Sequence, residues 1–139
     1  MATINDLADG IEARLATVSG LHGSSEWQNT PNPPAVLILV QSGPEGATFD
    51  TLHQVTFRLL VLVTLANGIA KAQRQLHQFM DASGTYSIKA ALDGDDSLGS
   101  VAQYCLTEGM LWRDEHQYEI NTVNYWGASL ENLVVYYDA

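Results

Sequence analysis

Residues 52–65, LHQVTFRLLVLVTL, constrain the fold more than any other segment. Successive side chains of a β-strand point to opposite faces, so the odd-numbered positions from 55 to 63 form one wholly apolar face. The other face begins with Gln54, Thr56 and Arg58 and becomes apolar at Leu60 and Leu62. This pattern predicts a strand that is central in its sheet, and covered on both faces, over half of its length. The apolar face comprises Val55, Phe57, Leu59, Val61 and Val63.

Two segments have the apolar spacing of amphipathic helices. The first is 3–18, in which Thr3 is a candidate N-cap and Asp6 lies in the first turn, where the helix dipole favours an acid. The second is 67–84, with Asn67 as a candidate cap and Gly84 at its end. A shorter helix is expected over SIKAAL, residues 87–92.

Strand-forming residues fill most of the remaining chain. Residues 35–42 form a continuous apolar run, 21–27 can hold a short strand, and three strands are expected within 101–112, 118–128 and 130–138. Residues 43–50 and 93–100 are expected to be loops. The expected order is α-β-β-β-α-α-β-β-β, which lacks regular βαβ alternation. It therefore predicts an α+β fold, a mainly antiparallel sheet with α-helices packed on one face.

The bulk properties favour one folded domain over residues 1–139. A net charge of -10, from 16 acidic and 6 basic residues, argues against binding DNA through its phosphates, although DNA could still pass close by. A single cysteine suits a reducing compartment. We expect no signal peptide and no membrane association, since the longest apolar run is much shorter than the about 20 residues needed to span a bilayer.

No motif for catalysis or cofactor binding is recognisable, so we expect neither an enzyme nor a cofactor. The four histidines lack metal-ligand spacing. The acidic triplet Asp93, Asp95 and Asp96 departs from the calcium-loop pattern, because glycine stands second and Tyr104 occupies the twelfth position. A solvated loop is the favoured interpretation, and a weak Ca²⁺ or Mg²⁺ site the alternative. Cys105, in a predicted strand, is expected to be a small buried hydrophobe.

Aromatic residues crowd the C-terminal third of the chain. The adjacent pairs Tyr125–Trp126 and Tyr136–Tyr137 must each place one ring on either face of a strand. The runs VLILV and LLVLV are also apolar on both faces, and a chain of this size has few elements with which to cover two faces. Another subunit is therefore expected to cover part of the sheet, and some of these rings are expected to be exposed or to contact it.

The layout resembles that of the tail terminator (tail-completion or neck) proteins of long-tailed bacteriophages. The resemblance spans nearly the whole chain and lies in LADGIEARLATVSGL, TPNPPAVLILV, TFRLLVLVTL, AKAQRQLHQFMDASGTYSIKAAL, DGDDSLGSV and YWGASLENLVVYYD. It implies a small α+β domain that assembles into a hexameric ring at the end of the tail tube. Such a ring stops tube polymerisation and forms the surface that joins the head.

The resemblance implies a structural virion protein, assembled in the host cytoplasm, with the tail-tube protein and the head–tail connector as partners. DNA would pass through the ring without specific binding. Loops 41–52 and 93–100 are expected to become ordered on assembly. The residues expected at contacts with other subunits or partners are Trp112, Tyr125, Trp126, Asp93, Asp95, Asp96 and Phe49.

Several alternatives remain open on the sequence alone. A head–tail adaptor or a tail-tube subunit has a similar size and composition. A small ligand-binding or enzymatic α+β domain would need a pocket that gathers histidine or acidic side chains. A host-encoded partner-binding module could use the same aromatic residues on a flat face.

Overall fold

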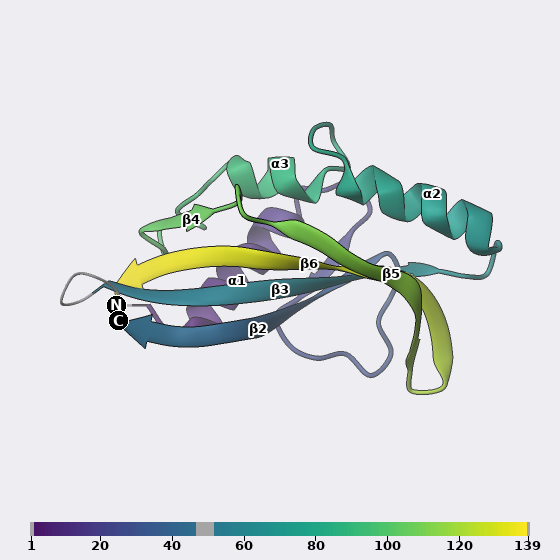
Figure 1. Cartoon of the computed structure of the whole chain (residues 1–139), viewed down its shortest axis with the longest axis horizontal. Helices are drawn as coiled ribbons and strands as arrows, with labels where there is room; N and C mark the ends of the chain where they lie inside the picture. Colours follow the sequence, from purple (N-terminus) through teal and green to yellow (C-terminus); the bar gives the residue numbers. More distant parts are fainter. Residues whose placement is uncertain (1, 47–51, 139) are drawn as a thin grey trace.

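The computed structural model describes residues 2–46 and 52–138 and shows a mixed α/β fold: a curled, mostly antiparallel sheet with three helices (Figure 1). The element order agrees with the order predicted from the sequence. The elements are α1 (Ile4–Leu15), β1 (His22–Ser24), β2 (Ala35–Gly46), β3 (Leu52–Thr64), α2 (Ile69–Met80), α3 (Ile88–Asp93), β4 (Tyr104–Leu106), β5 (Leu111–Ile120) and β6 (Val123–Asp138).

The sheet has the strand order β1-β2-β3-β6-β4, and β5 also pairs with β6. Only β1 and β2 pair in parallel; the other described pairs are antiparallel. Strand β3 lies between β2 and β6 along nearly its whole length. The predicted central position is confirmed, but the expectation that it holds for only half of the strand is wrong, because the polar end of β3 is also paired on both sides. The long strand β6 carries β4 near its C-terminal end and β5 over the rest of its outer edge.

The main core lies on the apolar face of β3, as predicted from its alternation. Each helix contributes buried side chains to it, for example Ile11 of α1, Leu76 of α2 and Leu92 of α3. Residues of β6 that pair with this face, such as Leu130 and Val135, complete it. At about 25 cal/mol per Å² of apolar surface removed from water, burial of this kind contributes most of the favourable free energy that folds a small domain.

A second core covers the other face of β3 at Leu60 and Leu62. The residues packed there are Leu37 of β2 and Ile120 and Tyr125 of the β5–β6 hairpin. The hairpin curls at this end of the sheet (Figure 1). The two apolar faces of β3 are therefore covered within one chain at this end, where the sequence pattern indicates another subunit.

Local sequence explains where the helices begin. Thr3 caps α1 as predicted: its hydroxyl accepts from the backbone N–H of Asp6 at 3.1 Å, and the Asp6 carboxylate accepts from the N–H of Thr3 at 3.0 Å. The expectation that Asn67 caps α2 is wrong. Gly68 occupies the N-cap with φ of 94°, a conformation that glycine adopts without strain, and no side chain caps this helix.

Two strand boundaries differ from the prediction. Strand β2 continues to Gly46, through the first half of the segment 43–50 expected to be a loop, because it pairs with β3 despite register shifts after Val40 and Ser42. The chain reverses at Asn121–Thr122, where both residues have positive φ, as in the tight turns of β-hairpins. The segments 118–128 and 130–138, expected as separate strands, are thus the end of β5 followed by one continuous strand, β6.

Candidate interaction surfaces

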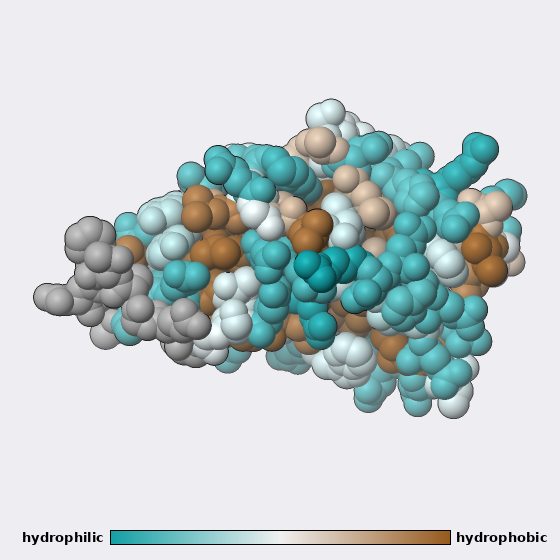
Figure 2. Space-filling model, in the orientation of Figure 1, coloured by the Kyte–Doolittle hydropathy of each residue, from teal (hydrophilic) through white to brown (hydrophobic). Residues whose placement is uncertain are grey.

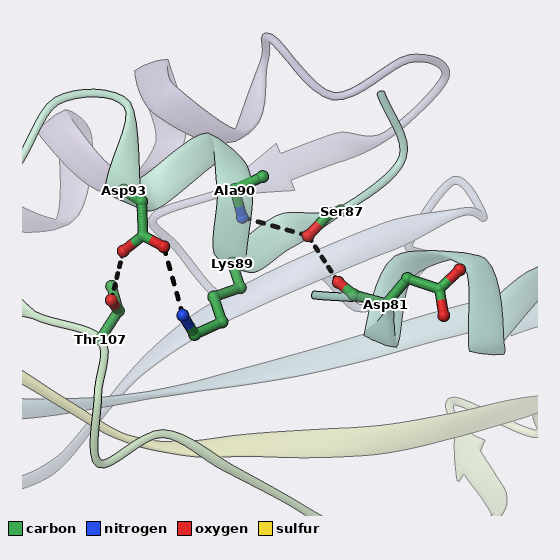
Figure 3. A network of polar contacts seen from close by, with 6 residues as sticks. All are labelled: Asp81, Ser87, Lys89, Ala90, Asp93 and Thr107. Atoms are coloured by element: carbon green, nitrogen blue, oxygen red, sulfur yellow. Dashed lines mark hydrogen bonds and ion pairs between the residues drawn. The ribbon is translucent and has the colours of Figure 1, made fainter. Parts of the chain in front are cut away.

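A polar network fixes both ends of α3 (Figure 3). At its start, the buried Ser87 hydroxyl accepts from the N–H of Ala90 at 3.1 Å and donates to the carbonyl oxygen of Asp81 at 2.5 Å, just after α2. At its end, the Asp93 carboxylate pairs with Lys89 at 3.3 Å and accepts from the hydroxyl of Thr107, beyond β4. Asp93 therefore joins α3 to the segment after β4.

Asp95 organises the loop that follows α3. Its carboxylate accepts from the Ser97 hydroxyl at 2.7 Å, the Ser97 N–H at 3.1 Å and the Gly99 N–H at 3.0 Å. These bonds, the Ser97 hydroxyl foremost, hold the pKa of Asp95 below its usual value. The interaction is present at neutral pH and is lost as pH falls through the lowered pKa. Asp96 is exposed.

The same loop is anchored to α1 by an apolar contact. Leu98 is 1% exposed and belongs to the main core. A Cβ atom at Gly10 of α1 would lie 2.7 Å from the carbonyl oxygen of Leu98, so only glycine allows this close approach. These contacts favour a loop that is already ordered in the isolated chain, whereas the expectation that residues 93–100 become ordered on assembly stays a prediction. Of the other loop, residues 41–46 belong to β2 and 47–51 lie outside the described residues.

Trp126 joins β6 to α2 through a carboxylate. Its Nε1 donates to Glu115 of β5 at 3.0 Å, and Nε2 of His77 lies 3.0 Å from the same carboxylate. Partial burial raises the pKa of Glu115, but the hydrogen bonds from Trp126 and His77 outweigh it and the pKa lies below its usual value. Trp126 is half-buried and packs against the main core.

The sequence-predicted interface residues fall into two separate groups. The three aspartates lie together at the end of α3, whereas the aromatic residues lie on β5 and β6. Trp112 and Trp126 both pack against the main core, but Tyr125, 5% exposed, fills the second core, and its hydroxyl donates to the carbonyl oxygen of Pro31 at 3.3 Å. Phe49 lies outside the described residues. The predicted opposition of adjacent rings is confirmed, because Tyr137 belongs to the main core and Tyr136 does not.

The described residues leave one surface of the sheet uncovered, and no sequence pattern indicates it. Tyr104 and Leu106 of β4 pair with Tyr136 and Val134, on the face opposite the main core. They are 39% and 40% exposed, and Leu111 of β5 is 43% exposed. The rings of Tyr104 and Tyr136 stack at 4.7 Å. We call this surface the bare face; its residues are Tyr104, Leu106, Leu111, Val134 and Tyr136. Figure 2 shows this side of the molecule, with brown apolar atoms open to solvent.

Other features provide little for small-molecule chemistry. A surface hollow between α1, β1 and the segment before β2, lined by Glu12, His22 and Gln28 among others, has a volume of about 290 Å³, slightly below the roughly 300–1,000 Å³ of typical ligand sites. In the part of the chain that the structure describes, no three His, Cys, Asp or Glu side chains gather as they would around a metal ion. No helix in that part has the length and apolar character needed to cross a membrane.

Cys105 is buried, as predicted, and belongs to the main core. Burial, followed by the negative charges of Asp96, Asp93 and Asp95, raises the pKa of its thiol to about 11. Because the thiolate is the reactive form, we expect an aromatic disulfide reagent at pH 8 to label the native chain roughly a hundredfold more slowly than the urea-unfolded chain. Absorbance of the released thiolate measures both rates. Equal rates would show that Cys105 is accessible.

Comparison of the sequence with protein-family models and with curated proteins finds no match in either set.

Proposed function

We propose that the chain is a structural subunit of a phage neck, a tail terminator that forms a homo-oligomeric ring at the head-proximal end of the tail tube, with six copies as the family resemblance implies. The observation that carries this proposal is the bare face, where Tyr104, Leu106 and Leu111 stand exposed beside a well-packed core. Exposed apolar surface of this kind marks sites of protein contact. In the proposed subunit, the helices form a single layer on one face of the sheet, and the other face is free to contact a neighbouring subunit.

The charge of the chain is compatible with this role. A ring closes by contacts between two different surfaces of each subunit, one of which the bare face would supply. With a net charge of -10, a ring of such subunits repels phosphate and lets DNA slide through without being held. An assembled ring with a basic lining would contradict this part of the proposal.

Electron microscopy of particles assembled without this chain tests the proposal. We expect overlong tails of irregular length beside filled, tailless heads, because tube growth has lost its stop. Tails of normal length that fail to join heads would assign the chain to a head–tail adaptor instead. Intact, infectious particles would exclude a role in the neck and favour a partner-binding or ligand-binding domain. Particles made with the chain restored are the control.

A further inference from the structure

The bare face carries basic as well as apolar side chains. Arg58 lies on the same side of the sheet, because its neighbours in β3, Phe57 and Leu59, face the main core. Arg58 is exposed, and among the described residues it has no ion-pair partner. Arg113 of β5 is also exposed and lies 3.9 Å from Glu131. Two of the six basic residues of the chain therefore stand at the bare face.

The opposite side of the molecule is acidic. Helix α1 lies behind the sheet when the bare face is viewed from the front (Figure 1). Its buried residues face the main core, and its solvent side carries Asp6, Asp9 and Glu12 at intervals of three, which places them along one stripe. Asp6 and Asp9 are exposed, and neither has an ion-pair partner within the described residues.

We propose that the bare face binds the acidic side of α1 from a second copy of this chain. A sheet is commonly covered by helices on its apolar surfaces, and here the α1 helix of a neighbouring copy would cover the bare face. Its carboxylates would meet Arg58 and Arg113, while the small side chains Ala13 and Ala16 leave room for Leu106. This inference rests on the proposed function, because it names the two surfaces by which successive subunits of the ring meet.

Charge complementarity selects α1 as the occupant. Helix α2 is the other exposed helix with a charged stripe, but its exposed Lys71 and Arg74 would repel Arg58. The two surfaces lie on opposite sides of one chain. Each copy can therefore place its own α1 against one neighbour while its bare face binds the α1 of a second neighbour. A contact of this head-to-tail kind either closes into a ring or continues as a filament.

Sedimentation of the purified chain over a range of concentrations tests the pairing. The variants are Arg58→Glu on the bare face and Asp9→Arg on α1, each at an exposed position that folding tolerates. We expect the wild type to self-associate and each single variant to associate roughly a hundredfold more weakly, because like charges then face each other. An equimolar mixture of the two variants should self-associate with near wild-type affinity, with the two variants alternating along the assembly. One contact then joins the introduced Glu to the introduced Arg, and the next joins the unchanged Arg58 of one variant to the unchanged Asp9 of the other.

Lys71→Glu is the matched control, because it makes the same charge change as Arg58→Glu on an exposed helix outside the contact. Circular dichroism confirms that each variant is folded. A loss of association in the control equal to that in Arg58→Glu, a mixture that fails to associate, or a wild type that stays monomeric at millimolar concentration would each overturn the inference. Overlong tails together with a monomeric wild type would retain the proposed function and reject this contact. Normal tails together with restored pairing of the two variants would retain this contact and reject the proposed function.

Discussion

Gly127→Ala is expected to lower the free energy of unfolding by about 2 to 3 kcal/mol, as overpacking of a closely packed site does. Gly127 lies in β6, opposite Leu62 of β3 and His116 of β5. A Cβ atom there would lie 2.5 Å from the carbonyl oxygen of Val61 and 2.8 Å from Cδ2 of Leu62. The first of these atoms belongs to the backbone of the central strand and cannot move without disturbing both of its neighbours.

The effect should appear as a lower urea midpoint with an unchanged slope. Gly109→Ala is the matched control. No atom lies within 4 Å of a Cβ added there, so the same substitution should leave stability unchanged or raise it slightly through the entropy of the unfolded chain. Equal stability of Gly127→Ala and the wild type would mean that β6 does not approach β3 as closely as the structure has it.

Features governed by local sequence are predictable in this chain. The cap of α1 depends on Thr3 and Asp6, three residues apart, and the two faces of β3 follow from alternation alone. The order of the elements follows from the same local patterns. The cap of α2 is an exception, because the polar Asn67 is a common cap residue, whereas the backbone conformation at Gly68 decides where this helix begins.

Features that depend on distant contacts are not predictable from local patterns. The turn at Asn121–Thr122 lacks the glycine that usually signals a tight hairpin, so the sequence does not indicate that the chain reverses there. The curl of this hairpin brings Tyr125 onto Leu60 and Leu62, the apolar residues for which the sequence pattern favours another subunit.

The candidate site shows the same division between local and distant effects. The sequence indicates aromatic residues on both faces of β6, but which rings are covered depends on the curl of the sheet. Tyr125 is covered by it, whereas Tyr104 and Leu106 of the three-residue strand β4 are left exposed. No pattern within such a short strand indicates that it ends at the rim of an uncovered surface. Alternation places Arg58 correctly on the polar half of β3, but its position on the bare face depends on the pairing of β6 with β4.

Leu98→Ala is expected to lower the free energy of unfolding of the isolated chain by about 2 to 4 kcal/mol, the usual cost of removing a fully buried leucine side chain. Leu98 has φ of 51°, and alanine meets the same backbone restriction, so the change isolates the loss of packing. Urea unfolding measures it. Ile69→Ala, at a residue that is 51% exposed, is the control and should change stability by less than about 0.5 kcal/mol.

The result for Leu98 also decides how residues 93–100 act in any assembly. A large loss of stability would mean that the loop is part of the folded core, so that Asp93 and Asp96 are presented to a partner in fixed positions and binding needs little further ordering of the chain. A loss as small as that of the control would mean that Leu98 is not held in the isolated chain. The loop would then become ordered only on contact, and binding would carry that entropic cost.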